Sequence, residues 1–171
     1  MLINAIVAVC NNKGIGYNNT IPWYLPNDLK YFQQKTTGFG NNALVMGRKT
    51  WESIPTILKN RDSLILSSSL EISEIKKGSL IKSFNNLNLL LQFIKISNYN
   101  TVWVIGGAEI YNLFLKKKLL DYIYITYINE TYECDIFFPK IPYNYKLIQN
   151  ISNNEKSNNG KNTKSYIFKK S

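Results

Sequence analysis

A single carboxylate near the start of the chain stands in a setting that could do chemistry. Asp28 is the only acidic residue among the first 51, and it lies between Pro26 and the aromatic Phe32. A carboxylate enclosed by such side chains can hold a nitrogen heterocycle through paired hydrogen bonds and support its protonation. The alternative is structural, because an acidic residue at the start of a helix complements the helix dipole by about 0.3–1 kcal/mol.

Two strand-to-helix junctions could bind phosphate groups. One carries Gly47 beside Arg48, Lys49 and Thr50, and the other carries the diglycine Gly106-Gly107. Free backbone N–H groups at a helix start favour anions, and two such junctions indicate a dinucleotide across the carboxyl ends of parallel strands. Neither the Walker nor the Gly-x-Gly-x-x-Gly spacing is present. Either junction alone could be an ordinary turn.

Arginine and histidine usage narrows the chemistry further. Only Arg48 and Arg61 are arginines among the 21 Lys and Arg residues, and the chain has no histidine. The fixed fork of arginine binds carboxylate or phosphate in a two-pronged manner, so both positions could hold anions, although two isolated arginines could also be chance. Without histidine, Ser-His-Asp systems, histidine-ligated zinc and histidine bases are excluded. Proton transfer then depends on a carboxylate, Tyr, Lys, Cys or water.

The composition is that of an ordinary globular protein. The 171 residues, 44% hydrophobic and 19% charged, suit one domain with a sizeable core. No apolar run approaches the roughly 20 residues that span a bilayer. The opening stretch MLINAIVAVC indicates a buried strand rather than a signal peptide, since it lacks a basic leader and a cleavage site. Only two cysteines, Cys10 and Cys134, predict a reducing compartment and hence a cytoplasmic location.

The net charge of +10 has two explanations. A basic nucleic-acid-binding domain would cluster its cations among exposed aromatic residues. The lysines here are scattered, in short runs at most, such as those at 116–118 and 169–170. Lys, Asn, Ile and Tyr share A/T-rich codons, so genome composition is the favoured explanation. The charge can still attract polyanionic ligands, an effect that salt weakens.

The elements that must position these residues alternate between strand and helix. This alternation predicts a single α/β domain over residues 1–171, with a twisted, mostly parallel sheet of about eight strands, an antiparallel C-terminal edge and helices on both faces. The predicted strands cover 2–9, 43–46, 63–67, 79–82, 101–105, 121–128, 145–150 and 165–169. The predicted helices start near Asn27 and at Thr50, and cover 87–96 and 108–116, with loops at 11–26 and 152–164.

Seven segments together resemble the dihydrofolate reductase family over nearly the whole chain. They occur in the order and at the spacing of the family, which makes the combination highly specific although each segment alone is weak. The segments are Ala5–Ala8, Gly14–Gly16, Ile21–Trp23, Leu25–Leu29, Met46–Ile54, Ile105–Tyr111 and Asp135–Pro139.

The resemblance implies a pterin site around one carboxylate. Asp28 matches the acid that grips the pterin amino group and ring nitrogen, supported by Thr126 directly or through water. Arg61 would bind the α-carboxylate of the substrate's glutamate. Trp23 and Tyr111 join Asp28 and Thr126 in the catalytic group. The implied walls of the substrate pocket are Ile6, Val7, Ala8, Leu29, Phe32, Ile54 and Ile105.

The resemblance also implies an NADPH site and no metal. Arg48, Lys49, Ser67 and Ser68 match the grip on the phosphates, and the Gly106-Gly107 peptide is cis in the family. The remaining implied cofactor contacts are Ala8, Ile15, Gly16, Gly47, Thr50, Ile105, Ala108, Glu109, Ile110 and Tyr111.

The implied reaction is hydride transfer from NADPH to dihydrofolate, giving tetrahydrofolate for one-carbon metabolism and thymidylate synthesis. Without histidine, Asp28 is expected to raise the basicity of the ring nitrogen while water delivers the proton, with burial raising the pKa of Asp28. The loop 11–25 is expected to close over the nicotinamide. The expected ligands include antifolates such as methotrexate, and a monomer without membrane or specific nucleic-acid partners is expected.

A same-fold alternative is an NADPH-dependent pterin or pyrimidine reductase, such as that of the riboflavin pathway. That family shares the sheet and the cofactor site but lacks the pair formed here by Trp23 and Asp28. These two residues therefore discriminate between the two enzymes.

Overall fold

The computed structural model describes residues 1–151 and 163–171. A nine-stranded sheet runs in the order β10-β11-β8-β1-β7-β3-β4-β6-β5, and β2 and β9 form a separate small sheet. The main strands are β1 (Leu2–Cys10), β3 (Asn42–Gly47), β4 (Arg61–Leu66), β5 (Ser73–Lys76), β6 (Ser79–Phe84), β7 (Thr101–Gly106), β8 (Tyr122–Ile128), β10 (Tyr145–Ile151) and β11 (Thr163–Lys170). The small sheet pairs β2 (Gly14–Gly16) with β9 (Ile136–Phe137), and the helices are α1 (Pro26–Thr37), α2 (Arg48–Ser53), α3 (Leu87–Ile96) and α4 (Ala108–Lys116).

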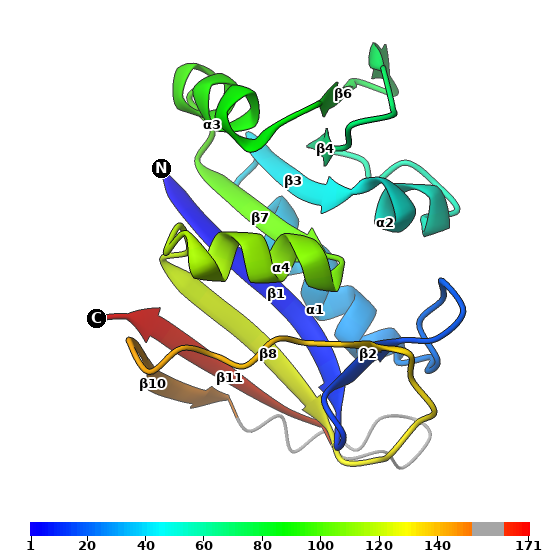
Figure 1. Ribbon diagram of the computed structural model, residues 1–171, viewed down its shortest axis with the longest axis vertical. Coiled ribbons are helices and arrows are strands. Elements are labelled where there is room, and N and C mark those ends of the chain that lie inside the picture. The colour runs from blue at the N-terminus through cyan, green and yellow to red at the C-terminus, as the bar shows by residue number, and fades with distance from the viewer. Residues whose placement is uncertain (152–162) are drawn as a thin grey trace.

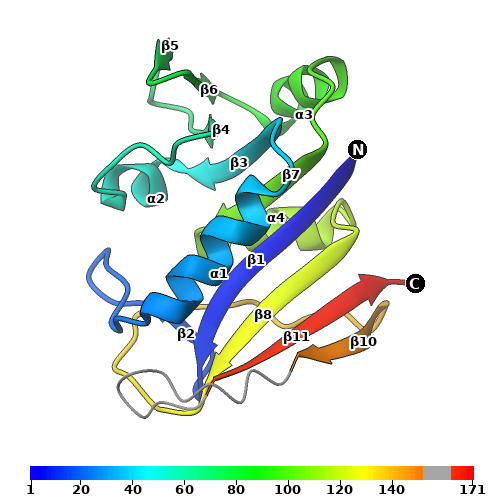
Figure 2. The same cartoon turned by 180° about the vertical axis from the view of Figure 1, so that it is seen from behind.

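The sheet separates two hydrophobic cores because its central strands are covered on both faces. Figures 1 and 2 show α4 and α1 crossing opposite faces of β1. Alternate residues of β1 follow this division: Val7 packs in the larger core with α3 and α4, whereas Ile6 packs in the core next to α1. Period-two alternation places successive side chains on opposite faces. The apolar sequences of the central strands are therefore those of doubly covered parallel strands.

The two central strands separate part of the way along the sheet. Parallel pairing between β1 and β7 runs from Leu2 and Thr101 to Ala5 and Val104. Beyond that point β1 continues beside β8 as far as Cys10, and β7 continues beside β3 as far as Gly106. The sheet therefore opens between the carboxyl ends of β1 and β7, where α/β sheets commonly bind ligands.

The predicted α/β class, mostly parallel sheet and antiparallel C-terminal edge are confirmed. β11 pairs antiparallel with both β8 and β10. The helices at 87–96 and 108–116 have the predicted bounds. The predicted loop 152–164 is wrong at its end, since Thr163 already belongs to β11, and its remainder lies outside the described residues.

Other differences between the predicted and the observed helices and strands have local causes. Sequence patterning missed β2, β5 and β9, because each has only two to four residues and no alternation that reveals a buried face. The edge strand β5 makes nine strands where about eight were expected. The second helix begins at Arg48 rather than Thr50, since extended Gly47 already acts as its N-cap. The first helix is longer than expected, with twelve residues ending before Gly38 at φ 49°.

Candidate active site

One face of α1 connects the two charged groups that the sequence selected. Asp28, Phe32 and Thr36 are spaced by four residues, which places them on the same side of a helix. Asp28 lies in the first turn, and Thr36 is buried near the other end. At a rise of 1.5 Å per residue, about 12 Å of helix separates them.

Asp28 is half-buried and lies next to β8. Burial raises the pKa of Asp28 above its ordinary value, and a hydrogen bond from the Thr126 hydroxyl partly lowers it. The sequence predicted both the direction of this shift and the contact with Thr126. Thr126 is itself buried, and its Oγ1 lies 3.3 Å from Oγ of Ser165. Either hydroxyl can donate in this second contact, so Ser165 can supply its proton when the Thr126 hydroxyl is directed to Asp28.

Two hydroxyl groups near Asp28 were not selected from the sequence. Ser165 lies opposite Thr126 in the β8–β11 register. Tyr31 is half-buried on α1, where burial, followed by the charges of Tyr124 and Asp28, raises its pKa to about 12. Neither has a sequence signal of its own: the antiparallel pairing that brings Ser165 to β8 joins segments about 40 residues apart.

The other end of the α1 face meets a buried guanidinium. Arg61 is only 5% exposed. Its Nη1 donates to Oγ1 of Thr36 at 2.7 Å, and its Nε donates to the Lys59 carbonyl at 3.1 Å. The Phe32 ring centroid lies 6.0 Å from its Cζ. Burial lowers the pKa of Arg61 from its usual value, but a guanidinium remains charged at neutral pH.

Within residues 1–151 and 163–171, Arg61 forms no ion pair with an acidic side chain. A buried charge without a counter-ion is costly. The site is therefore suited to an anionic ligand group, and the hydrogen bond to Thr36 fixes the direction of the guanidinium.

The opening between β1 and β7 is bordered by backbone. Tyr111 is a buried residue of α4, and its hydroxyl donates to the Ile6 carbonyl at 2.8 Å. Ile6 is the first β1 residue beyond the pairing with β7, so Tyr111 supplies the hydrogen bond that β7 no longer gives. Burial raises the pKa of Tyr111, which keeps the phenol protonated as this donor.

The residues predicted to line the substrate pocket differ in exposure and in the face of the sheet on which they lie. Ile6 is buried, Leu29 is 50% exposed at the mouth, and the side chain of Val7 points into the opposite core. Any contact of Val7 with a ligand in the opening therefore involves its backbone. Half-buried walls that accompany Ile6 are Ala8, Phe32, Ile54 and Ile105.

The two glycine-containing junctions lie next to each other because β3 and β7 are neighbours. A Cβ at Gly47 would lie 3.2 Å from Cγ1 of Ile110, and a Cβ at Gly107 would lie 3.4 Å from Oγ1 of Thr50. Each junction thus packs against the helix of the other. The Gly106-Gly107 peptide is cis, as the family resemblance predicted.

These junctions leave backbone donors and cations facing the same edge. Gly107 caps α4 without a side-chain hydrogen bond, so the first N–H groups of that helix have no capping side chain. Arg48 and Lys49 are exposed, and Nη1 of Arg48 pairs with Oε1 of Glu52 at 2.8 Å. Ser67 uses its Oγ to accept from the N–H groups of Ser69 and Leu70, whereas Ser68 is exposed. The predicted contacts Ala108, Glu109 and Ile110 form the first turn of α4.

The segment 11–25 contains the last predicted residues. Ile15 and Gly16 lie in β2, which pairs with β9. Trp23 is half-buried, and its ring centroid lies 5.3 Å from that of Tyr132. The segment therefore rests on residues that follow β8, rather than on α1 alone.

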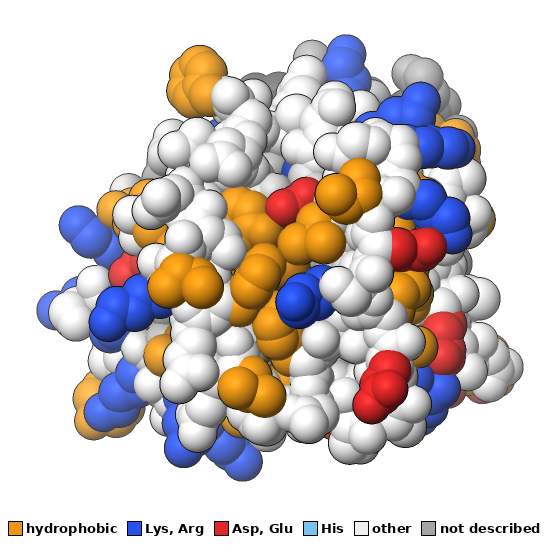
Figure 3. Space-filling model, turned by 90° about the horizontal axis from the view of Figure 1, so that it is seen from above, with side chains coloured by type: hydrophobic (Ala, Val, Ile, Leu, Met, Phe, Trp, Pro, Cys, Tyr) orange, Lys and Arg blue, Asp and Glu red, His pale blue; other side chains and the backbone are white. Residues whose placement is uncertain are grey.

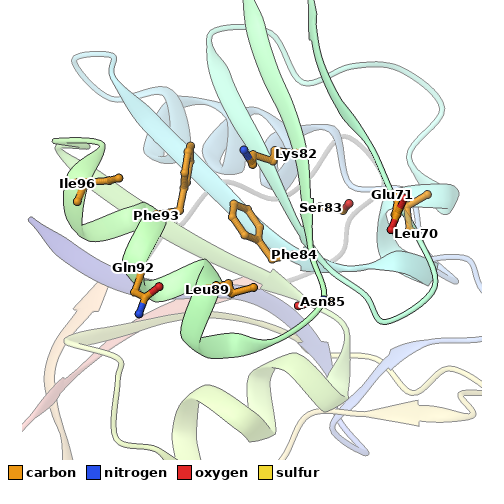
Figure 4. Close-up of a pocket in the computed structure, with 10 residues that line it drawn as sticks. All are labelled: Leu70, Glu71, Lys82, Ser83, Phe84, Asn85, Leu89, Gln92, Phe93 and Ile96. Carbon is orange, nitrogen blue, oxygen red and sulfur yellow. The ribbon is translucent and has the colours of Figure 1, made fainter.

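The surface does not favour an extended polyanion site on the face that Figure 3 shows. Hydrophobic side chains gather in a band across the middle of that face, and most Lys and Arg side chains lie toward its edges in separate groups, although blue side-chain atoms also border the band near its centre. A pocket of about 500 Å³ lies elsewhere, between β6 and α3. Figure 4 shows Phe84 and Phe93 together in this pocket, which contains none of the predicted site residues.

The described part of the chain has neither a cluster of metal ligands nor a helix that could cross a membrane. No group of three or more Cys, Asp or Glu side chains could hold a metal ion there. None of its helices is long and apolar enough to cross a membrane.

The fold and the site define a single-domain α/β protein whose parallel central strands β1 and β7 separate toward their carboxyl ends. The family model described as dihydrofolate reductase matches residues 2–170. Dihydrofolate reductase of Gallus gallus is 39% identical over 158 residues, covering 85% of this chain and 82% of the relative. The enzyme of Drosophila melanogaster is 35% identical over 153 residues, with 85% and 83% covered. The viral dihydrofolate reductase of Saimiriine herpesvirus 2 is 40% identical over 159 residues, with 86% and 74% covered.

The chain therefore belongs to the dihydrofolate reductase family. It is an NADPH-dependent oxidoreductase that reduces dihydrofolate to tetrahydrofolate. This assignment favours the prediction based on Trp23 and Asp28 over the same-fold riboflavin-pathway alternative.

Proposed function

We propose that dihydrofolate lies along the α1 face, with its pterin at Asp28 and its glutamate carboxylate at Arg61. The observation that carries this proposal is the single helix face that joins a half-buried carboxylate, through Phe32 and Thr36, to a buried guanidinium without an acidic partner among the described residues. A ligand with a hydrogen-bonding heterocycle at one end and a carboxylate at the other complements both. The proposed substrate contacts are Ile6, Val7, Ala8, Asp28, Leu29, Phe32, Ile54, Arg61, Ile105 and Thr126.

The residues at the strand ends fit NADPH. The uncapped start of α4 and the glycine-containing junctions give its pyrophosphate access to backbone N–H groups. Arg48 and Lys49, with Ser67 and Ser68, would hold the phosphates, and Arg48 would exchange Glu52 for the 2′-phosphate. The other proposed contacts are Ala8, Ile15, Gly16, Gly47, Thr50, Ile105, Gly106, Gly107, Ala108, Glu109, Ile110 and Tyr111.

In the proposed mechanism the chain orients the pterin and controls one proton. NADPH, when bound, supplies the hydride. Asp28 accepts hydrogen bonds from the pterin amino group and ring N–H, which raises the basicity of the nitrogen that must be protonated. A water molecule delivers that proton, since no histidine is present. Thr126, backed by Ser165, holds the Asp28 carboxyl in place, and Tyr111 fixes the Ile6 carbonyl at the pocket wall.

The segment 11–25 would then close over the reacting rings and exclude bulk water. Trp23 helps to cover Asp28 in this arrangement, and Ile15 and Gly16 border the nicotinamide. We also propose that residues 1–171 act as one dihydrofolate reductase domain, a cytoplasmic monomer without a specific nucleic-acid partner. Its product would serve one-carbon metabolism and thymidylate synthesis, and antifolates such as methotrexate would bind in place of substrate.

Following NADPH absorbance tests the activity directly. The absorbance should decrease only when dihydrofolate is added, and methotrexate should stop the decrease. NADPH oxidation that proceeds without dihydrofolate, or that methotrexate leaves unchanged, would contradict the proposed pterin site. Filter binding of single-stranded RNA at physiological salt tests the alternative function, and strong retention would favour it.

A further inference from the structure

The two cysteines of the chain lie together, although 124 residues separate them in sequence. Their Sγ atoms are 3.9 Å apart, and both thiols are free. Cys10 is the buried last residue of β1, and Cys134 is half-buried in the segment that leads into β9. A covalent sulfur–sulfur bond is about 2.05 Å long, so the two atoms need to approach by about 2 Å.

Asn12 holds the backbone on both sides of this thiol pair. Its Oδ1 accepts from Sγ of Cys10 at 2.9 Å and from the Gly14 N–H at 3.0 Å. Its Nδ2 donates to the Tyr132 carbonyl at 3.0 Å. The same side chain therefore ties the start of the 11–25 segment to the residues that precede Cys134.

Gly14 makes the approach of the two sulfurs possible. A Cβ at this position would overlap Sγ and Cβ of Cys134. Only a residue without a side chain lets Cys134 pack across the loop toward Cys10. The Gly14 carbonyl also lies 3.5 Å from Sγ of Cys10, so both thiols contact the same glycine.

We propose that Cys10 and Cys134 form a reversible intramolecular disulfide, a modification site that fastens the 11–25 segment to the segment before β9. Residues 14–16 already pair with β9, and the Asp135 N–H donates to the Gly16 carbonyl at 3.1 Å. A covalent link at the base of this contact would restrict the opening of the segment. The effect on turnover rests on the proposed function, whereas disulfide formation does not.

Glutathione disulfide is a sufficient oxidant for this step. The Cys134 thiolate attacks one sulfur of glutathione disulfide, which forms a mixed disulfide and releases one glutathione. The Cys10 thiolate then attacks the Cys134 sulfur and expels the second glutathione. Two protein thiols are thus oxidised, one glutathione disulfide is reduced to two glutathione molecules, and the two thiol protons pass to the released glutathione.

The partly exposed thiol must react first, because Cys10 is buried. Partial burial, followed by the hydrogen bond and charge of Cys10 and then the charge of Asp135, raises the pKa of Cys134. The thiolate is therefore scarce at neutral pH, and oxidation should accelerate as the pH rises. In a reducing compartment the thiols would predominate until the glutathione pool becomes oxidised.

Incubation of the full chain with glutathione disulfide at mildly alkaline pH tests the proposal. Intact-mass measurement should show the loss of two hydrogen atoms, both thiols should disappear together, and dithiothreitol should restore them. In the Cys134→Ser chain the remaining thiol, Cys10, should not react with glutathione disulfide, because it is buried. In the Cys10→Ala chain the reaction should stop at a single glutathione adduct on Cys134, because no second thiol can displace the glutathione. A stable glutathione adduct on the unaltered chain, a disulfide-linked dimer, or two unreacted thiols would each overturn the proposal.

Amide hydrogen exchange tests whether the disulfide restricts the 11–25 segment, independently of whether the disulfide forms. Exchange across residues 11–16 should slow by about threefold or more in the oxidised chain, because local opening becomes more costly. The Cys134→Ser chain, treated in the same way, should not change. A disulfide that leaves this exchange unaltered would refute the fastening role. Disulfide formation in a chain without dihydrofolate turnover would instead overturn only the proposed function.

Discussion

At the scale of residues, burial determines what the charged groups can do. Asp28 lies in the first turn of α1, whereas Arg61 begins β4 and contacts Thr36 near the other end of that helix. The two charges are too far apart to neutralise each other. Desolvation makes the charged form of a carboxyl less favourable. A desolvated guanidinium stays charged, and binding an anion stabilises it. We therefore propose that Asp28 and Arg61 select different ligand groups.

Asp28→Asn should reduce kcat/KM for dihydrofolate by about 10²–10⁴-fold, because the amide cannot support protonation of the ring nitrogen. The Kd for NADPH should remain nearly unchanged. Steady-state kinetics and cofactor titration measure both quantities. Glu71→Gln, at an exposed carboxylate outside the cleft, is the matched control. Normal turnover by Asp28→Asn would remove Asp28 from the mechanism.

The same substitution should increase stability at neutral pH. Because burial raises the folded-state pKa of Asp28, its stabilising contribution is complete below the ordinary value of 3.8 and is lost as the pH rises through the folded value. Above that value the ionised carboxylate reduces the free energy of unfolding. Urea unfolding of Asp28→Asn should therefore show a gain at pH 7 that disappears in acid. A loss of stability at neutral pH would contradict the direction of the pKa shift.

Arg61→Lys should increase KM for dihydrofolate by about 10–100-fold with a smaller change in kcat, since a charge-assisted hydrogen bond contributes about 1.5–3 kcal/mol. Lysine cannot reproduce the fork that donates to both Thr36 and a carboxylate. Arg48→Lys is the matched comparison, and it should increase KM for NADPH instead. If both variants altered the same KM, the separate anion assignments would be wrong.

At the scale of elements, the cleft depends on where neighbouring strands stop pairing. β1 and β7 separate beyond Ala5, and the helices that follow β3 and β7 begin next to each other. Tyr111 reaches from α4 to the Ile6 carbonyl and packs against Gly106. Strand ends, helix starts and one buried phenol thus form a continuous wall.

Gly106→Ala should reduce the free energy of unfolding by about 1–3 kcal/mol, because Gly106 has φ 116°. The added Cβ would also lie 3.2 Å from Cε2 of Tyr111. Gly78→Ala is a matched control, since Gly78 has φ 77° but no atom within 4 Å of the added Cβ. Urea unfolding should show a smaller loss for Gly78→Ala, and only Gly106→Ala should increase KM for NADPH. Equal losses with unchanged KM would show that the contact with Tyr111 has no importance.

At the scale of the whole molecule, the net charge attracts anionic ligands over a long range, whereas the fold determines where the binding groups lie. The net charge of +10 creates an attractive field for anionic ligands without specifying where they bind. On the face in Figure 3 the cations form separate groups, and the apolar band lies between them. We therefore expect the long-range field to concentrate anionic ligands and the groups of the proposed site to select among them.

Raising the NaCl concentration should increase KM for NADPH by roughly threefold or more per tenfold change in salt, because screening weakens attraction by the net charge. The kcat should change little. Sucrose at matched osmolality is the control, since it adds no ions. A KM that is independent of salt would show that the net charge has no part in cofactor capture.

Much of this arrangement could be predicted from short stretches of sequence. The helices at 87–96 and 108–116 follow from local periodicity, and Gly47 and Gly107 mark the ends of buried strands. Asp28 was recognisable because it stands alone among apolar neighbours. Ser165, Tyr31 and the full environment of Arg61 were not, because each acquires its role from a partner on another element.

Residue types and their spacing thus determined which groups could perform the reaction and which elements would carry them. Tertiary structure decided which groups meet: Thr126 with Ser165, Arg61 with Thr36, and Cys10 with Cys134. The physical reason is range. Periodicity and capping act within a few turns of chain, whereas strand order, the separation of β1 from β7 and the enclosure of Asp28 depend on packing between distant segments.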